Sequence, residues 1–482
     1  MPSEHSNENP VRPCCRGILP GAVLCLFFSQ SPVRLAAQAT PSAPPVVQSP
    51  SSFQGSVPVG EVSSQPLDLT LDDAIQRGLR NNLGVILSNT QVSGVRGQKL
   101  SQLQALLPTL DASWKEAVEQ VDLAALGLRG AGFPRIVGPF GYTDLRAYFS
   151  WAAVNVNSIR NYLAARHNFD AAQLSAQDAR DLVVLTVGNA YLLVLADESQ
   201  VASAQTQVAT SKVSLDQAVN SHQAGTAPLL DELRARVDYQ TLQQQLIVAQ
   251  NSLEKDRLAL ARTIGLPLAQ KFNLVDKEPF APFDQVDVDA AIRQAHAGRK
   301  DLAAAAEQTS AAEEQRKAAT ADRYPTVKVD VDYGLIGVNF GNSHGTVDAT
   351  GTVSVPLFKE YGLRGEAEQA QSQLDTQRAQ LSDLNAQVDA DVRDALLDIA
   401  SAQQQVAVAR SSVDLANEAL SEAQQRYAAG VSDNLAVHQA EQSVAVANDQ
   451  YVGSLYRHNL AKLSLARALG AAENYKSYLG GK

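Results

Sequence analysis

The feature that most constrains how this chain can fold is an internal repeat that covers nearly its whole length. Early in each copy the matching segments lie 217 residues apart, as in 73–75 with 290–292 and Pro108 with Pro325. Later they lie 205 residues apart, as in Gly225 with Gly430 and 260–265 with 465–470. The difference, 217 − 205 = 12 residues, is extra length after Pro108 in the first copy. A repeat this long is not a solenoid unit. We therefore expect two halves of one architecture, related by approximate symmetry.

The first 39 residues have the layout of a secretory signal peptide. Arg12 and Arg16 precede an apolar stretch at 18–28, and Ala37-Gln-Ala39 offers a small-x-small cleavage site. The apolar stretch is too short to span a membrane as a helix. All three cysteines of the chain lie in the same segment, at Cys14, Cys15 and Cys25. The mature chain would then contain no cysteine; a lipoprotein signal that ends at the third cysteine is the alternative.

Composition excludes one broad class of function. Removing residues 1–39 deletes three arginines and two glutamates, which moves the net charge from −11 to −12. An acidic exported protein is not a nucleic-acid binder. Aromatic residues make up only 6% of the chain, which suits long helices better than a thick globular core. Residues 40–66 are rich in proline and serine, so we expect a disordered linker there and ordered structure from about Leu67.

Two proline-free segments, 157–224 and 360–429, carry a heptad pattern that predicts very long supercoiled helices. Large residues recur every seven positions with small ones interleaved, as in Ile399, Val406, Val413, Leu420 and Tyr427 with Ala402, Ala409, Ala416 and Ala423. Each helix would be on the order of 100 Å long. A glycine turn and a shorter amphipathic helix follow, at 228–264 and 433–469. Each copy should therefore contain a long helical hairpin.

In the second copy the apolar period falls from 3.6 to 2 after Pro325, which predicts strands at 326–338 and 346–355. Apolar residues such as Val347 alternate with charged ones such as Asp348. Runs of about ten residues match the length of a tilted strand that crosses a bilayer. Charge on one face suits a wet lumen, and the apolar face suits lipid.

The first copy repeats this strand pair less regularly, at 109–116 and 143–152. The glycine-rich stretch 126–133 between the two runs is expected to be an extracellular loop. Trp114 and Trp151 both fall in this hairpin, where interfacial aromatic residues are expected. In isolation the pattern also fits two half-buried hairpins of a soluble sheet. Lipid forbids open strand edges and four strands cannot close a barrel, so several chains must share one; three chains give twelve strands.

These features together resemble the TolC family of outer-membrane efflux proteins, over residues 67–470. The resemblance is carried by the duplicated plan, by Ser354-Val-Pro-Leu-Phe358 with Tyr361-Gly362, and by the turns at 222–233 and 427–435. It implies a mainly α fold with membrane β: repeats at 67–270 and 284–470, and a tail at 471–482. A homotrimer would form a twelve-stranded β-barrel in outer-membrane lipid, continuous with a periplasmic barrel of helices. Segments 71–80 and 287–297 would form a collar around it.

The resemblance also implies an exit duct of a tripartite efflux or type I secretion system. A periplasmic adaptor protein and an inner-membrane pump of the RND, ABC or MFS type would be its partners. The adaptor would dock at the glycine turns, through Gly225, Thr226, Gly430 and Val431. On the residues alone, these turns are equally well explained as helix C-caps without a binding role.

Gate residues carry over in part from the resemblance. Tyr427 and Asp231 occupy the positions of the family's latch, in which a tyrosine bonds to a carboxylate and closes the periplasmic end. Tyr427 is explained as well as the last residue of the heptad seam. Positions that carry an acidic ring in the family hold Ala436 and Gln439 here, which puts that constriction in doubt; Asp433 is a shifted substitute.

No enzyme or cofactor site is predicted from the residues. The seven histidines are scattered, and no phosphate-binding glycine loop is present to supply transport energy. Two other functions compete with the duct. A periplasmic coiled-coil scaffold or adhesin stalk would need neither wet-faced strands nor matching turns, and a hydrolase of the envelope would need a catalytic grouping.

Overall fold

The computed structural model describes residues 50–125, 127, 134–276, 280–283, 286–432 and 434–479. The expected signal peptide, the start of the expected linker, most of the loop at 126–133, and Asp433 lie outside these residues. By contacts the chain divides into two compact units. One contains 113–146 and 334–346, which are parts of the strand hairpins, and the other contains 47–112, 147–333 and 347–482.

The larger unit repeats one set of helices twice, and the boundaries reproduce the two spacings of the sequence. The first set is α1 (Leu71–Asn81), α2 (Leu83–Gln104), α3 (Val156–Gln223) and α4 (Leu229–Ile264). The second is α5 (Val288–Gly298), α6 (Lys300–Ala321), α7 (Glu360–Ala428) and α8 (Asn434–Ala468). From α1 to α5 the start moves by 288 − 71 = 217, and from α4 to α8 by 434 − 229 = 205. The predicted internal duplication is therefore confirmed.

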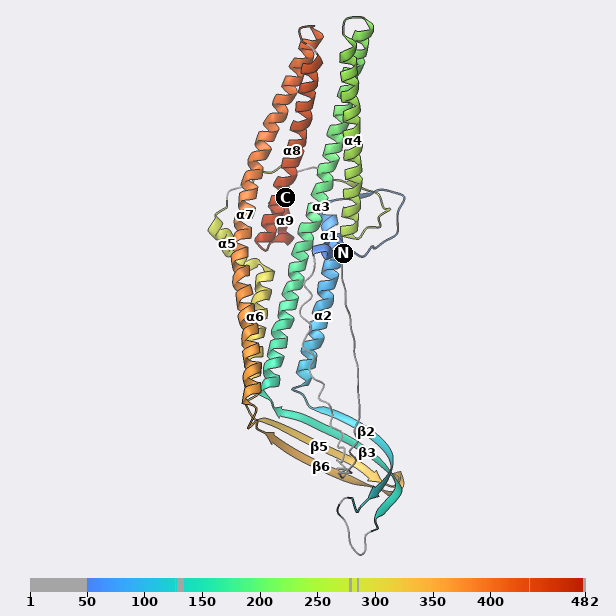
Figure 1. Cartoon of the computed structure of the whole chain (residues 1–482), viewed down its shortest axis with the longest axis vertical. Helices are drawn as coiled ribbons and strands as arrows, with labels where there is room; N and C mark the ends of the chain where they lie inside the picture. The colour runs from blue at the N-terminus through green and yellow to red at the C-terminus, as the bar shows by residue number, and fades with distance from the viewer. Residues whose placement is uncertain are drawn as a thin grey trace, which may run out of the picture. The chain divides into compact units, whose positions relative to one another are not determined.

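The four longest helices form two hairpins. Figure 1 shows α3 beside α4 and α7 beside α8, and α6 packs against both α3 and α7. The heptad residues bury the inner face of α7, where Ile399 and Val406 are almost fully buried between the interleaved alanines. By length and composition α3 is the one described helix that could cross a membrane, but 61% of its most apolar window is buried inside the chain.

Each of the four hairpin helices ends in the same glycine motif. Gly225, Gly265, Gly430 and Gly470 all have φ between 67° and 78°. At Gly225 the next amide donates back five residues, from Thr226 to the carbonyl of Ser221, and the glycine amide donates to His222. The left-handed backbone lets these amides reach carbonyls that would otherwise have no partner at the helix end.

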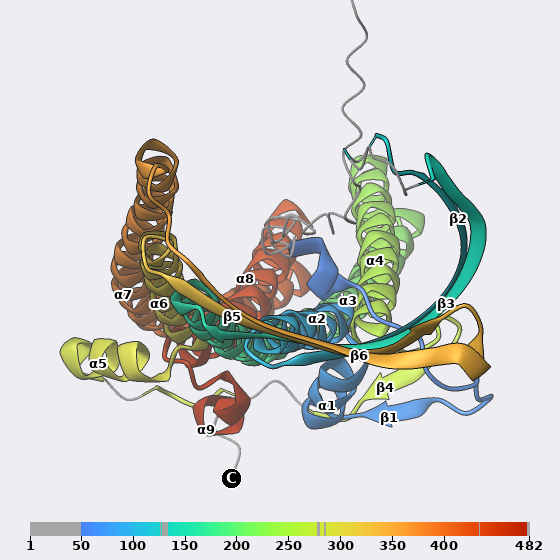
Figure 2. The same cartoon turned by 90° about the horizontal axis from the view of Figure 1, so that it is seen from below.

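A small parallel sheet ties the start of the first copy to its end. β1 (Leu67–Leu69) pairs with β4 (Phe272–Leu274), and Figure 2 shows the two strands side by side next to α1. The hydroxyl of Tyr191, on α3, donates to Asp276 Oδ2 at 2.8 Å and lies 3.1 Å from the carbonyl oxygen of Leu69. These bonds hold both strands against the apolar core around α1, α3 and α4.

The expected linker and tail are more ordered than their composition suggested. From Pro50 the chain forms a short 3-10 helix (Pro50–Gln54), and Phe53 is buried against the core. The amide of Val57 then donates to Asn81 at 2.9 Å. At the other end, α9 (Tyr475–Leu479) is anchored by the Tyr475 hydroxyl, which donates to Asp72 at 2.6 Å. Within the described residues, the second half of the expected linker is thus anchored to the core through Phe53 and Val57, although it is rich in proline and serine.

The remaining strands are β2 (Thr109–Asp122), β3 (Ile136–Val154), β5 (Thr326–Gly337) and β6 (Ser343–Ser354). They form a four-stranded sheet in the order β2-β3-β5-β6. In the first copy β2 and β3 extend beyond the expected 109–116 and 143–152. Polar side chains explain the extension, since Lys115 Nζ donates to the hydroxyl of Tyr142, which donates to Glu119 at 2.9 Å. Such cross-strand pairs stabilise strands that have no apolar alternation.

A buried ion network joins the helices of the second copy. Arg299 is 6% exposed and donates to both oxygens of Asp301, at 3.1 and 2.6 Å, and to Asp391 at 2.6 Å. Burial alone would raise the pKa of Asp301, but the guanidinium of Arg299 lowers that pKa below its usual value. The carboxylate is therefore ionised and paired. Removing Arg299 takes away its hydrogen-bonded partner and leaves only Arg467, whose Nη2 lies 3.8 Å from Asp301 Oδ2.

We predict that Arg299→Leu lowers the free energy of unfolding by about 3–5 kcal/mol, because Asp301 loses its partner. Arg323→Leu is the matched control. Arg323 pairs with Glu360 at 2.7 Å, but both side chains are largely exposed, so its loss should cost about 1 kcal/mol or less. Denaturant unfolding followed by helical circular dichroism measures both, and equal losses would contradict the prediction.

We predict that two glycines with the same backbone conformation respond differently to alanine. A Cβ at Gly225 meets nothing within 4 Å, whereas one at Gly265 lies 2.6 Å from the Cβ of Asn81 and 2.9 Å from the carbonyl oxygen of Val57. Gly225→Ala should cost about 1–2 kcal/mol from the left-handed backbone alone. Gly265→Ala should cost about 1–3 kcal/mol more, because it also overpacks the site. Thermal unfolding compares the two variants, and a smaller loss at Gly265 would refute the steric argument.

Candidate functional site

The two glycine turns that end α3 and α7 are open to solvent. Gly225, Thr226 and Gly430 are all exposed, and Val431 presents an apolar side chain that is 71% exposed. Neither glycine would bring a Cβ within 4 Å of another atom. The turns therefore present backbone that another molecule can approach closely. Their role in adaptor docking stays a prediction.

The predicted latch residues lie on different hairpins. Tyr427 is in the last turn of α7 and half-buried, and Asp231 is in the first turn of α4. Asp231 lies 3.9 Å from Arg234 on its own helix. Among the residues that the structure describes, no hydrogen bond joins Tyr427 to Asp231. The latch therefore stays a prediction. The missing acidic ring stays a prediction as well: Ala436 and Gln439 lie on α8, and Asp433 is outside the described residues.

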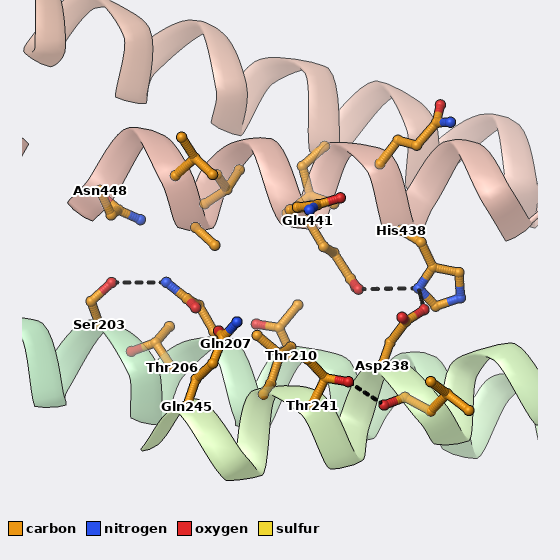
Figure 3. A pocket seen from close by; sticks show the side chains of 18 of the residues that line it. Ser203, Thr206, Gln207, Thr210, Asp238, Thr241, Gln245, His438, Glu441 and Asn448 are labelled. Atoms are coloured by element: carbon orange, nitrogen blue, oxygen red, sulfur yellow. Dashed lines mark hydrogen bonds and ion pairs between the residues drawn. The ribbon is translucent and has the colours of Figure 1, made fainter. Parts of the chain in front are cut away.

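A cavity of about 1110 Å³ lies between the two hairpins, a short way along the helices from the turns. Its walls come from α3, α4 and α8, with Asn417 and Leu420 of α7. Figure 3 shows that many of its side chains are uncharged and polar: Ser203, Thr206, Gln207, Thr210, Thr241, Gln245 and Asn448. Because both hairpins line this space, its size changes whenever one hairpin moves relative to the other.

At one end of the cavity four side chains connect the hairpins. His438 Nδ1, on α8, lies 2.9 Å from Asp238 Oδ2 on α4 and 3.6 Å from Glu441 Oε2 on its own helix (Figure 3). The hydroxyl of Ser214, on α3, donates to Glu441 Oε1 at 2.6 Å. The side chains of His438 and Glu441 are each only 9% exposed. We call these four residues, Ser214, Asp238, His438 and Glu441, the inter-hairpin cluster.

The carboxylates of the inter-hairpin cluster favour the charged imidazole. The neighbouring Glu441 carboxylate is the largest cause that raises the pKa of His438 above its usual value of 6.5. Burial opposes this rise, and the negative charges of Asp238, Glu441 and Asp231 add to it. The imidazole is therefore protonated, and paired across the two hairpins, to a higher pH than a free histidine.

The inter-hairpin cluster was not predictable from the sequence pattern. The only local signal is the spacing of His438 and Glu441, three residues apart on one helix, which places them on one face. Asp238 corresponds by the 205-residue spacing to Ser443, so the repeat carries no trace of the pair. Only the packing of α8 against α3 and α4 brings the four residues together.

The strand hairpins expose apolar side chains on a regular face. Eleven of the twelve residues of β6 are exposed, among them Val347 at 70% and Val353 at 66%. Asp348 and Thr350 share the opposite face, and the hydroxyl of Thr350 donates to Asp348 at 2.7 Å. An apolar face that large and uncovered is expected of a surface that meets lipid or another protein.

The two tryptophans lie in different strands of the first copy. Trp114, in β2, is 65% exposed and its ring lies 5.8 Å from that of Phe340. Trp151, in β3, is 39% exposed, and its indole nitrogen donates to the carbonyl of Leu106 at 3.2 Å. The indole nitrogen of Trp114 donates to Glu116 at 3.3 Å, so both tryptophans combine an exposed apolar ring with a polar partner, which suits a membrane interface. That role stays a prediction.

Comparison with known proteins gives this arrangement a family. The model of the family described as "Outer membrane efflux protein" matches residues 150–266 and 291–471. The toluene efflux pump outer membrane protein TtgF of Pseudomonas putida is 24% identical over 413 residues, which cover 84% of this chain and 83% of that protein. Among solved structures, the outer membrane protein VceC of Vibrio cholerae has a TM-score of 0.73 at 20% identity, over 83% of this chain and 96% of the other. The outer membrane channel CmeC of Campylobacter jejuni has a TM-score of 0.74 at 15% identity, over 91% of this chain and 97% of the other.

The family match covers more than half of the chain and includes all four hairpin helices. The structural neighbours share the plan of long helical hairpins with a strand portion, so the predicted fold class is confirmed. The relatives are outer membrane components of efflux pumps. The chain belongs to the outer membrane efflux protein family and is an outer-membrane exit duct with a large periplasmic portion.

Proposed function

We propose that three copies of this chain close a twelve-stranded barrel, through which small organic molecules leave the cell. The observation that carries the proposal is the sheet order β2-β3-β5-β6, which leaves β2 and β6 as edges. An unpaired strand edge in lipid costs several kcal/mol for each backbone group without a partner. Pairing β6 of one copy with β2 of the next removes every such edge at once.

Transport energy has to come from a partner, because the chain contains no phosphate-binding loop. We propose that an inner-membrane pump of the RND, ABC or MFS type supplies it through a periplasmic adaptor. The adaptor would contact the open turns at Gly225, Thr226, Gly430 and Val431, where no side chain blocks its approach. The name of TtgF, a component of a toluene efflux pump, supports an apolar organic cargo.

Within this duct, we propose that Tyr427 and Asp231 form the resting latch at the periplasmic end. A phenol donates a charge-assisted hydrogen bond to a carboxylate, which is stronger than a bond between neutral groups. Tyr427 belongs to the α7/α8 hairpin and Asp231 to the α3/α4 hairpin, so that a bond between them would hold the hairpins together. Opening would then require this bond to break.

The lipid-facing side of β6 is tested by one pair of arginine variants. Val347→Arg places a charge on the apolar face and should cost about 2–4 kcal/mol per chain if that residue lies near the bilayer midplane. Thr350→Arg, on the opposite face, should assemble normally and shift ion selectivity toward anions. The heat stability of the trimer extracted in detergent measures the first effect, and the reversal potential in a planar bilayer measures the second. The proposed faces would be wrong if Thr350→Arg disrupted assembly more than Val347→Arg.

The latch is tested by the conductance of single channels in a planar bilayer. Wild type should show a small conductance, and Tyr427→Phe combined with Asp231→Ala should raise it, because the proposed bond is removed. Tyr451→Phe combined with Asp216→Ala is the control, since it removes the same groups farther from the turns. Equal conductance in all three proteins would keep the duct and discard the latch. No conductance from a folded trimer would count against the duct itself.

A further inference from the structure

The inter-hairpin cluster has a different chemistry from the proposed latch. It contains one imidazole between two carboxylates, and it joins α8 to both α3 and α4. His438 is eight residues past Gly430, and Asp238 is thirteen past Gly225. The ion pair of the cluster therefore joins the second helix of each hairpin, and Ser214 adds a contact from α3. All four residues are set back from the turns, where they can hold the hairpins together independently of Tyr427.

The charge of His438 decides whether this contact attracts. With a protonated imidazole the three ionisable groups sum to −1 + 1 − 1 = −1, and the cation lies between the two carboxylates. With a neutral imidazole they sum to −2, and Glu441, whose side chain is 9% exposed, keeps only the hydroxyl of Ser214 as a partner across the hairpins. A buried carboxylate that loses its countercharge is costly. The contact between hairpins is therefore strongest when His438 is charged.

Within the part of the chain that the structure describes, the charged groups that act on His438 are carboxylates. The groups that face His438 are Glu441 on its own helix, Asp238 and Asp231 on α4, and Ser214 on α3. All the charged groups among them are acidic. Arg234, on α4, also lines the cavity and lies 3.9 Å from Asp231 on its own hairpin.

We propose that the inter-hairpin cluster is a proton-operated clamp, which holds the two hairpins together in the closed duct at low pH and releases them as the pH rises. The proposal rests on the proposed gating, in which opening separates the hairpins. Movement of α8 away from α4 would separate His438 from Asp238 and widen the cavity between them. The cluster thus couples the ionisation of one side chain to the distance between two helices.

The direction of the pH effect follows from the environment of His438. Its pKa in the assembled cluster, which the proposal assigns to the closed state, lies above the usual 6.5, because Glu441 and Asp238 stabilise the imidazolium. A group whose pKa is raised contributes its full stabilisation below the usual value, and loses it as the pH rises through the raised value. The closed state should therefore be most stable below pH 6.5 and weaken toward and above neutral pH.

The test is the open fraction of wild-type channels in planar bilayers, measured between about pH 5.5 and pH 8.5. Wild type should open more often as the pH rises. His438→Gln, which cannot be charged, should already open more often than wild type at the acid end, because the cation that pairs with Asp238 is missing. Its pH profile should be flat. His438→Lys, which stays charged throughout, should remain mostly closed at every pH.

His167→Gln is the matched control. His167 Nδ1 lies 2.7 Å from Glu307, but this pair joins α3 to α6 and does not bridge the hairpins. The variant should therefore keep the wild-type profile. Assembly of each variant is checked by its migration as a trimer.

Three results would overturn the clamp. A wild-type profile that does not change with pH, or an unchanged profile in His438→Gln, would remove the role of the proton while leaving conduction intact. A shift of His438→Lys in the same direction as His438→Gln would show that the site senses shape and not charge. Absence of conductance in wild type at every pH would instead refute the gated duct, and the clamp with it.

Discussion

A backbone amide in lipid has no water to bond with, and this constraint underlies the organisation of the whole chain. Within one copy the sheet satisfies it only in the interior, because β2 and β6 each have one neighbour. The strand portion of a single chain is therefore incomplete as a membrane structure. In the proposed trimer, closure of the barrel satisfies the edges, and the threefold arrangement also determines how the helical hairpins meet.

In the helical unit a different kind of interaction dominates. The helices pack through alternating large and small residues, so that Ile399 and Val406 are buried while the alanines beside them let neighbouring backbones approach. Packing of this kind is apolar and does not depend on pH. The contacts between the two hairpins near the cavity are polar instead, as in Ser214 with Glu441 and His438 with Asp238. The contacts between helices of one hairpin are thus independent of pH, whereas the contacts between the two hairpins near the cavity depend on ionisable groups.

The parts of the fold that follow local rules were predictable from the sequence. The heptads and the glycine turns predict the helices, because both signals depend on residues that are close together in the chain. The two spacings predict the duplication, because the sequence can be compared directly with itself. The order at Phe53 and Tyr475 was not predictable, since each is anchored by a partner that is far away along the chain or packs from another helix. The same reason hid the inter-hairpin cluster. His438 and Asp238 are 200 residues apart, and neither belongs to a recognisable motif.

The four glycine endings share one backbone geometry but have different surroundings. At Gly265 and Gly470 another backbone segment lies directly against the missing side chain, while at Gly225 and Gly430 the space is empty. The endings at Gly265 and Gly470 are thus packed against the rest of the fold. The endings at Gly225 and Gly430, called free ends here, have the same backbone conformation without such a neighbour. A side chain at either free end would meet no other atom, so the left-handed backbone alone restricts these two positions to glycine. The residues next to these glycines, such as Thr226 and Val431, could therefore diverge to suit a new partner while the rest of the protein stays the same.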